Sequence, residues 1–206
     1  MEKYTENSAA PGRERFQRQL AFLLEADREK EIVRQTYLAD GSRKENDAEH
    51  AWHLALFAMV LKEYANTEID LLKVISMVLI HDVVEIDAGD TYAYDTEGQK
   101  TAEERERKAA ERLFGLLPED QGSAFKELWE EFEAWESPEA RFAHTLDNFQ
   151  PFLLNVAGDG RSWLEHGVHV QSVLKRNERT ASGSGTVWAY MKELIERNLA
   201  EGKLKP

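Results

Sequence analysis

Residues 69–84 read IDLLKVISMVLIHDVV, and this stretch decides the fold. It is apolar nearly all round, although it contains Lys73 and Ser76 and ends close to the adjacent pair His81 and Asp82. A helix that is hydrophobic on every side is normally buried among other helices. The stretch therefore predicts a central helix that carries an imidazole and a carboxylate near its end.

The sequence around this stretch also has helical periodicity. Asp47 can cap a helix in which His50 and His53 lie on one inward face. Ser137-Pro138 is a helix start, and the helix it opens carries Asp147. Further helices are expected at residues 16–37, where one or two fit, and at residues 101–116, 119–134, 163–176 and 186–199. Since no alternating strand pattern and no internal repeat is visible, we predict an all-α helical bundle.

The length and composition of the chain favour one globular domain. The chain has 206 residues, of which 42% are hydrophobic and 32% are charged. A chain of this size can bury most of the apolar surface that its unfolded form exposes. We expect a flexible tail at residues 1–13, where little apolar pattern is present, and a single helical domain at residues 14–206.

The charge and the residue types limit the partners and the kinds of site. The formal net charge is −13, so the surface as a whole repels nucleic-acid backbones and anionic lipid, and we expect neither as a partner. Cysteine is absent, which excludes disulfides and thiolate ligands and leaves His, Asp and Glu for any metal. No signal or membrane-spanning pattern is visible, and a cytoplasmic location is expected.

The pair His81 and Asp82 needs an explanation, because burying a charge is costly unless it is paired or bound to a metal. Taken alone, the pair is more simply a hydrogen-bonded core histidine beside a capping aspartate. With His50 on an inward helix face and Asp147 on a later amphipathic helix, the chain offers two imidazoles and two carboxylates. Such a set suits one divalent cation and leaves positions for water and a phosphate oxygen. Manganese, cobalt, iron, zinc and magnesium all remain open.

Four segments in a fixed order carry a family resemblance: residues 43–50 (RKENDAEH), 81–85 (HDVVE), 88–90 (AGD) and 145–147 (TLD). Through them, from about residue 30 to residue 200, the chain resembles the HD-domain phosphohydrolases, specifically the branch of small single-domain 5'-deoxynucleotidases. The resemblance implies an HD-domain helical bundle that forms a homodimer. It also implies that one divalent metal is bound by the residues that match the family ligands, which are His50, His81, Asp82 and Asp147.

The resemblance further assigns two carboxylates to catalysis. Glu85 matches the family's catalytic glutamate and is implied to orient a catalytic water. It lies about one helical turn past His81, so it can stay near the metal without being a ligand. Asp90 matches the family's loop aspartate and is implied to be the general acid for the leaving 5'-oxygen. For either residue the alternative is a solvated loop carboxylate.

Two arginines are candidates for binding the phosphate, because a guanidinium can hold two oxygens at once. Arg34 matches the family arginine that touches phosphate if one inserted residue is allowed, and Arg43 lies on the ungapped match to His50. A surface arginine is the alternative for each. Gln35 stands where the best-known relatives have a tryptophan that crowds the sugar 2' position, which puts discrimination against ribonucleotides in doubt.

The function that the resemblance implies is hydrolysis of the 5'-phosphate of (deoxy)nucleoside monophosphates, a small-molecule nucleotide substrate, by a metal-dependent phosphohydrolase. Within the same superfamily, the alternative substrates are nucleoside triphosphates, guanosine polyphosphates and cyclic nucleotides. From another class, the alternative is a noncatalytic module that binds metal or nucleotide and regulates a partner. The presence of Glu85 and Asp90 beside the full ligand set favours chemistry.

Overall fold

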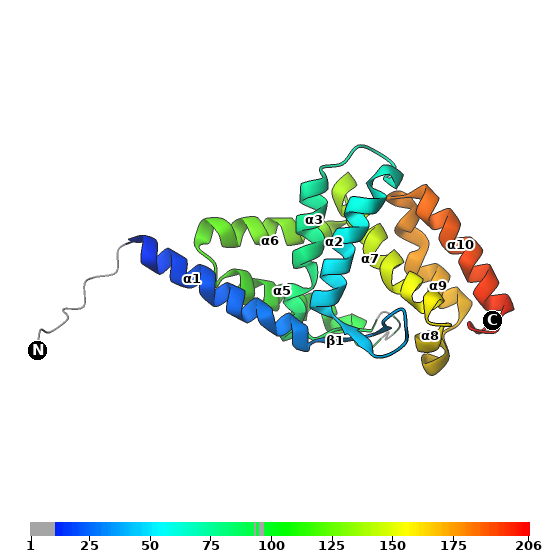
Figure 1. The fold of residues 1–206 in the computed structure, drawn as a ribbon. Helices are drawn as coiled ribbons and strands as arrows, with labels where there is room; N and C mark the ends of the chain where they lie inside the picture. The colour runs from blue at the N-terminus through cyan, green and yellow to red at the C-terminus, as the bar shows by residue number, and fades with distance from the viewer. Residues whose placement is uncertain (1–10, 93, 95–96) are drawn as a thin grey trace, which may run out of the picture.

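The computed structural model describes residues 11–92, 94 and 97–206, and this part of the chain is helical apart from one two-stranded ribbon (Figure 1). The α-helices are α1 (Pro11–Ala26), α2 (Asp47–Leu61), α3 (Leu71–Ile80), α4 (Glu85–Ala88), α5 (Gln99–Phe114), α6 (Glu119–Ala134), α7 (Pro138–Ala157), α8 (Arg161–His166), α9 (Val170–Asn177) and α10 (Gly185–Ala200). The strands are β1 (Val33–Tyr37) and β2 (Lys44–Asn46), and the 3₁₀ helices are η1 (Asp27–Glu31), η2 (Lys62–Tyr64), η3 (His81–Val84) and η4 (Glu178–Ser182). The prediction of an all-α fold is confirmed.

The predicted central helix is α3, which η3 continues. Its first turn is capped by Asp70, whose carboxylate accepts the backbone N–H groups of Leu72 and Lys73 at 3.0 and 3.2 Å. Val74 and Met77 are fully buried where α3 packs against α2, α6 and α7. Burial of each such side chain contributes about 1.5–3 kcal/mol, so the apolar face holds this helix in the centre.

Helix α2 starts at a capping box. The side chain of Asn46 accepts the backbone N–H of Glu49 at 3.0 Å, and the Glu49 carboxylate accepts the backbone N–H of Asn46 at 3.1 Å. The predicted cap at Asp47 is therefore wrong by one residue, because Asn46 at the end of β2 has the extended backbone that a cap requires. His50 consequently falls in the first turn of α2, where it is fully buried.

The ribbon of β1 and β2 corrects the sequence prediction for residues 16–37. The helix ends at Ala26, and residues 33–37 form a strand that runs antiparallel to β2, with Tyr37 opposite Lys44. Val, Thr and Tyr in this segment favour strands, and their pairing with β2 outweighs the helical spacing. The turn between the strands contains Gly41 at φ +69°, a conformation that costs glycine little.

Helix α1 runs alongside α5 and extends beyond the rest of the body (Figure 1). Its Arg15 pairs with Asp120 of α6 at 2.6 Å, and Phe22 is buried in the core cluster that α5 and α6 share. The helix begins at Pro11, so residues 11–13 of the expected tail are helical. Residues 1–10 lie outside the described residues.

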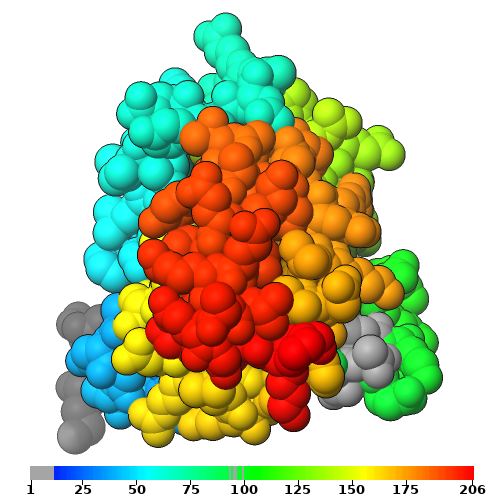
Figure 2. All heavy atoms as spheres, turned by 90° about the vertical axis from the view of Figure 1, so that its right-hand side faces the viewer, coloured from blue at the N-terminus to red at the C-terminus, as the bar shows by residue number. Residues whose placement is uncertain are grey.

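Helix α7 joins the two halves of the core. Phe142 and Leu146 pack toward α2 and α3, whereas Phe149 and Phe152 belong to the cluster formed with α8, α9 and α10. Figure 2 shows α10 lying across this end of the molecule. Pro151 lies inside α7 and has no N–H to donate to the carbonyl of Asp147. Among the described helices, none is both long and apolar enough to cross a membrane.

Candidate metal and phosphate site

Three buried side chains from three parts of the fold converge at the centre of the molecule. His50 comes from the first turn of α2, His81 from η3 at the end of α3, and Asp147 from the middle of α7. One ligand atom of each lies within 4.8 Å of the others, and all three residues are buried. The structure therefore brings together three of the four predicted metal ligands as a group that could hold an ion.

Each imidazole is fixed through its Nδ1 atom. Nδ1 of His81 lies 3.0 Å from the carbonyl oxygen of Val78, and a carbonyl can only accept, so Nδ1 carries the proton. The amide nitrogen of Gln150 donates to the Glu45 carboxylate at 2.9 Å, which turns its oxygen toward Nδ1 of His50, also at 2.9 Å. Nδ1 of His50 is then a donor as well. Such partners fix the tautomer in which Nε2 is free to bind a metal.

The Nε2 atoms of both histidines face carboxylate oxygens. Nε2 of His50 lies 3.0 Å from Oδ1 of Asp147, and Nε2 of His81 lies 3.6 Å from the same oxygen. Nε2 of His81 is buried and has no hydrogen-bond partner among the described residues. Lone pairs of nitrogen and oxygen that face each other are stabilised by a positive species between them. The donor set of imidazole nitrogen and carboxylate oxygen thus fits a divalent cation.

The pKa shifts of these groups point the same way. Burial alone would lower the pKa of His81, yet the carboxylates of Asp82 and Asp147 raise it well above its ordinary value. Burial would raise the pKa of Asp147, but its hydrogen bond with His50 and the neighbouring imidazoles hold it well below its ordinary range. The site therefore strongly favours extra positive charge, which either protons or a metal ion can supply.

Asp82 lies beside this group and links it to Arg34. Its Oδ1 is 3.1 Å from Nε2 of His81, and its Oδ2 is 3.8 Å from Nε2 of His50. Oδ2 also accepts a hydrogen bond of 2.6 Å from Nη1 of Arg34. Burial would raise the pKa of Asp82, but the charges of His81 and Arg34 hold it well below its ordinary range. Asp82 thus stays ionised and is shared between the metal cluster and the arginine.

Arg34 of β1 neutralises several buried carboxylates. Its Nη1 donates to Asp47 at 3.1 Å as well as to Asp82, and its Nε lies 3.9 Å from the Glu45 carboxylate. Only 15% of its side chain is exposed. Burial opposes its charge, but Asp82 and Asp47 raise its pKa well above the ordinary value. The guanidinium is fixed and permanently positive.

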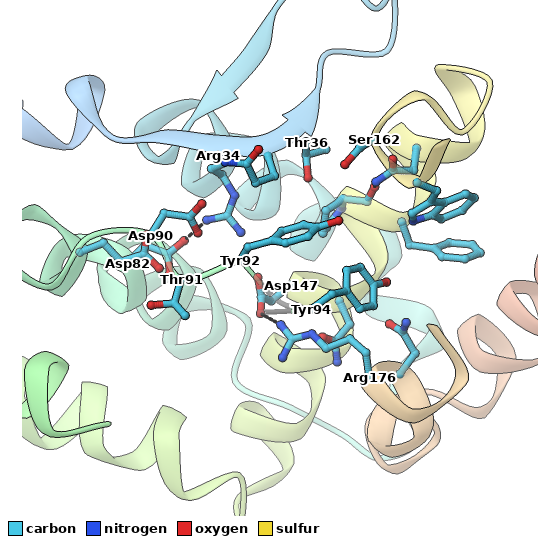
Figure 3. A pocket seen from close by; sticks show the side chains of 18 residues that line it. Arg34, Thr36, Asp82, Asp90, Thr91, Tyr92, Tyr94, Asp147, Ser162 and Arg176 are labelled. Carbon is cyan, nitrogen blue, oxygen red and sulfur yellow. Dashed lines mark hydrogen bonds and ion pairs between the residues drawn. The ribbon is translucent and has the colours of Figure 1, made fainter. Parts of the chain in front are cut away.

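A cavity of about 140 Å³ opens next to this cluster (Figure 3). One end of its lining is ionic and the rest is aromatic and polar. Its lining residues are Arg34, Gln35, Thr36, Asp82, Glu85, Asp90, Thr91, Tyr92, Tyr94, Asp147, Asn148, Pro151, Phe152, Asn155, Ser162, Trp163, Arg176 and Asn177. A pocket with charged groups at one end and flat apolar walls beyond suits a ligand with an ionic head and a ring system.

The two predicted catalytic carboxylates, Glu85 and Asp90, both line this cavity. Burial, together with the charges of Asp82 and Asp47, raises the pKa of Glu85 to about 12. Oε2 of Glu85 is buried and has no partner in the part of the chain that the structure describes. Burial also raises the pKa of Asp90. Glu85 is therefore held near the cluster in the protonated form, and a cation beside Asp82 would favour its ionisation.

The remaining predicted residues are divided between the cavity and the surface. Gln35 lines the cavity, and its amide oxygen accepts a hydrogen bond from Lys44 at 2.5 Å. Arg43 does not line the cavity. Its guanidinium is 54% exposed and binds both oxygens of Glu49, at 2.7 and 2.5 Å. Arg34 is the predicted phosphate-binding arginine that the structure brings to the cluster.

Sequence reasoning missed several residues that shape the site. Gln150 and Glu45 fix His50, and Asp47 holds Arg34, yet none of these contacts is visible from local spacing. The one available signal was Gln150, a polar residue one helical turn after Asp147 on a buried helix face. Arg176 reaches the cavity from α9 and gave no signal in the sequence.

The comparison with protein-family models places the chain in a family. The HD domain model matches residues 26–188, which is most of the chain and includes every residue of the cluster. The chain belongs to the HD-domain family. This HD domain is also similar to the 5'-deoxynucleotidase HDDC2 of Homo sapiens, at 32% identity over 111 residues, and to that of Bos taurus, at 33% over 112 residues. Each match covers 54% of this chain and 53% of the relative, so the chain spans about half the length of these curated relatives.

Solved structures extend the likeness to nearly the whole HD-domain chain. A crystal structure described as a predicted metal-dependent phosphohydrolase from Magnetospirillum magnetotacticum MS-1 is 47% identical, with a TM-score of 0.91. The match covers 96% of this chain and 99% of that one. A conserved hypothetical protein from Pyrococcus furiosus is 23% identical with a TM-score of 0.59, covering 88% and 99%, and shares the fold. The predicted HD-domain bundle is confirmed.

Proposed function

We propose that this HD-domain chain is a metal-dependent phosphohydrolase that removes the 5'-phosphate from (deoxy)nucleoside monophosphates. The observation that carries the proposal is the convergence of two Nε2 atoms and the Asp147 carboxylate at the ionic end of an otherwise aromatic and polar cavity. The names of the curated relatives and of the crystal structure from Magnetospirillum magnetotacticum support the same chemistry.

The residues present can hold one divalent cation. His50, His81 and Asp147 would be its ligands, with Asp82 beside them. When bound, such a cation polarises a phosphoryl oxygen and acidifies a water molecule. Manganese, cobalt, iron, zinc and magnesium all accept this mixture of imidazole and carboxylate to differing degrees.

The carboxylates around the cluster have complementary roles in the proposed reaction. Glu85, ionised once the site has gained positive charge, accepts the proton of the water that attacks phosphorus. Asp90, whose pKa is raised by burial, donates a proton to the 5'-oxygen as the bond between phosphorus and that oxygen breaks. Arg34 stabilises the negative charge on the phosphoryl group. The products are inorganic phosphate and a nucleoside.

A substrate and metal panel tests this function. The chain is treated with a chelator, reloaded with each divalent metal, and assayed for phosphate release from matched ribo- and deoxyribonucleoside mono-, di- and triphosphates, guanosine polyphosphates and cyclic nucleotides. Release from monophosphates alone is expected. Because Gln35 stands at the proposed sugar position, comparable rates on ribo and deoxy substrates are also expected. Preferred release from another class would replace the proposed substrate, and no release with any metal would favour a noncatalytic module.

Two variants separate metal binding from catalysis. Asp82→Ala should lose both bound metal and turnover, because it removes a carboxylate that lies 3.1 Å from Nε2 of His81. Glu85→Gln should keep the metal and lose turnover, because the proposed role of Glu85 is to accept a proton from water and not to coordinate the ion. Metal content is measured by elemental analysis. Full metal occupancy in Asp82→Ala would reject its role as a ligand, and unchanged turnover in Glu85→Gln would remove Glu85 from the reaction.

We also propose that the chain forms a homodimer through α2. Trp52, Leu56, Met59 and Val60 are exposed and lie on one face of this helix, with Trp52 61% exposed. A large exposed apolar patch on a helix is typical of a protein interface. Light scattering of the wild type should give the mass of a dimer, and Met59→Glu should give a monomer. Leu164→Glu on α8 is the control and should remain dimeric, because Leu164 is 56% exposed and Met59 is 60% exposed.

A further inference from the structure

Arg176 is a cationic side chain at the site to which the proposed reaction gives no task. It lies near the end of α9, and its guanidinium nitrogen Nη2 is 3.9 Å from Oδ2 of Asp147 (Figure 3). That distance is beyond a hydrogen bond, and 41% of the side chain is exposed. Arg176 is therefore near the proposed metal ligands, and its long ion pair with Asp147 leaves guanidinium N–H groups that can donate to a ligand.

The cavity is lined by more carboxylic acids than cationic side chains. Among the described residues that line it, Asp82, Glu85, Asp90 and Asp147 are carboxylic acids, and Arg34 and Arg176 are the cationic side chains. Arg34 already donates to two carboxylates. Among the described residues, Arg176 has only the ion pair with Asp147 at 3.9 Å. A phosphate that enters this cavity consequently meets one guanidinium that is hydrogen-bonded to two carboxylates and one whose ion pair is longer than a hydrogen bond.

Two cavities meet at Arg176. Besides the cavity described above, a second one of about 240 Å³ lies on the other side of the cluster, and Glu106 and Glu133 line it. Arg176, Asp82 and Asp147 line both cavities. Arg176 can therefore be reached by a ligand from either cavity.

Buried polar atoms beside Arg176 also lack partners. Asn148 is 4% exposed and lines the cavity, yet neither its amide oxygen nor its amide nitrogen has a hydrogen-bond partner among residues 11–92, 94 and 97–206. Within the same residues, the amide oxygen of Asn177, next to Arg176, is likewise buried and unpaired. An unpaired buried amide costs about 1–3 kcal/mol, and such a cost is commonly recovered when a ligand binds. These atoms indicate that the wall formed by α7 and α9 receives a polar ligand.

The backbone around Arg176 is well anchored. Val170 and Val173 of α9 are buried in the core cluster shared with α10, and the amide nitrogen of Asn177 donates to the carbonyl of Val173 at 2.8 Å. The first residue of α9 also donates its backbone N–H to Lys205 at 2.8 Å. The guanidinium is thus presented from a fixed helix, which lowers the entropy lost on binding.

We propose that Arg176 is a second phosphate-binding residue, which holds the phosphoryl group of the substrate from the α9 side while Arg34 faces it from β1. In Figure 3 Arg34 reaches toward Asp82 from β1, and Arg176 reaches toward Asp147 from α9. The inference rests on the proposed function because it requires a ligand with a phosphate group. It does not require that this ligand contain a nucleoside. A planar guanidinium binds two phosphate oxygens at once, which an ammonium group cannot do.

Inorganic phosphate is the probe for this proposal, titrated calorimetrically into the metal-loaded protein. Arg176→Gln should raise the dissociation constant for phosphate about tenfold or more, and Arg176→Lys should lie between this variant and the wild type. Lys175→Gln removes the same charge from the neighbouring exposed position and should change the constant less than about threefold. The affinity for the metal, measured by chelator competition, should not fall in Arg176→Gln.

Three outcomes would overturn the assignment. An unchanged phosphate affinity in Arg176→Gln removes the residue from the phosphate site, and an equal loss in Lys175→Gln shows a general field effect. Weaker metal binding in Arg176→Gln shows that the residue acts by positioning Asp147.

The failure of this proposal is distinguishable from the failure of the proposed function. If no nucleotide is hydrolysed but Arg176→Gln still weakens phosphate binding, the proposed substrate is wrong and the role of Arg176 stands. If monophosphates are hydrolysed and Arg176→Gln leaves both KM and phosphate affinity unaltered, the proposed function stands and the role of Arg176 is wrong.

Discussion

Nε2 of His50 lies 3.0 Å from Oδ1 of Asp147, and the other ring nitrogen of His50 is held by Gln150. The ring is fully buried, and Gln150 is its hydrogen-bond partner at Nδ1, with the Glu45 carboxylate 3.7 Å from the same atom. Gln150 in turn donates to Glu45, which forms a chain from a buried carboxylate to the proposed metal ligand. Removal of such a supporting group typically lowers metal affinity about 10–100-fold, although no ligand changes.

We therefore predict that Gln150→Leu loses metal affinity by about this factor and destabilises the protein by about 1–3 kcal/mol, because it leaves buried polar groups unpaired. Chelator competition and urea denaturation measure the two effects. Asn198→Leu is the control, since Asn198 is a buried amide that bonds to Leu194 far from the cluster. It should lose stability and retain metal affinity. Equal metal affinity in both variants would show that Gln150 does not orient His50.

Arg34 and Arg43 should differ sharply on substitution, although both were candidates from the sequence. Arg34→Ala leaves Asp47 and Asp82 buried without their cation, and breaking a buried pair typically costs about 3–5 kcal/mol. Arg43→Ala removes an exposed pair with Glu49, which is worth less than about 1 kcal/mol. Urea denaturation of the metal-free proteins measures the difference. In the loaded enzyme, Arg34→Ala should also lower kcat/KM, whereas Arg43→Ala should leave it within about twofold.

The contrast between these two arginines shows what the sequence could and could not predict. The buried helix α3 and the inward position of His50 follow from apolar periodicity, which a single helix displays without its neighbours. The ribbon was missed because β2 has only three residues, Lys44–Asn46, with no strand preference of their own. Its existence depends on pairing with β1. The ribbon places Arg34 in the lining of the cavity and Arg43 on the surface. Neither position could therefore be predicted from the local spacing of residues.

The same limit applies to polar contacts between distant segments. Gln150 meets Glu45 across 105 residues, and Arg176 approaches Asp147 from another helix. The sequence identifies residue types suited to a site and the helix faces on which they lie. It does not specify which polar side chains from other elements meet them, because that depends on how the helices pack.

His144 should make the free energy of unfolding depend on pH. Its ring is stacked between Phe132 and Trp135, each at 3.8 Å between ring centroids, and its Nε2 donates to the carbonyl of Phe132 at 2.8 Å. Burial lowers its pKa to about 4. The unfolded chain, with a histidine pKa of about 6.5, therefore binds a proton at a higher pH than the folded protein. Its contribution to stability is complete above about pH 6.5 and falls progressively as the pH drops toward 4.

Between about pH 7.5 and pH 5, this group should lower the free energy of unfolding by about 2 kcal/mol. His144→Phe retains an aromatic ring in the stack and cannot titrate, so it should lose about 2 kcal/mol less than the wild type over the same interval. Urea denaturation of the metal-free proteins at both pH values gives the comparison. If the two proteins lose equal stability, His144 is already protonated in the folded state or is not buried as described.

Gly183, at the end of η4, lies where η4 packs closely against α7. A Cβ atom at this position would clash with the carbonyl oxygen of Arg141 and with Oγ1 of Thr145 on α7. Backbone atoms cannot yield as a flexible side chain can, so Gly183→Ala should lower the free energy of unfolding by about 1–3 kcal/mol. Gly185→Ala is the control, because the nearest atom to its Cβ would be 3.7 Å away. That variant should stay within about 0.5 kcal/mol of the wild type. Equal stability of the two variants in urea would mean that η4 can move away from α7 without loss, and the close packing of these segments would not contribute to stability.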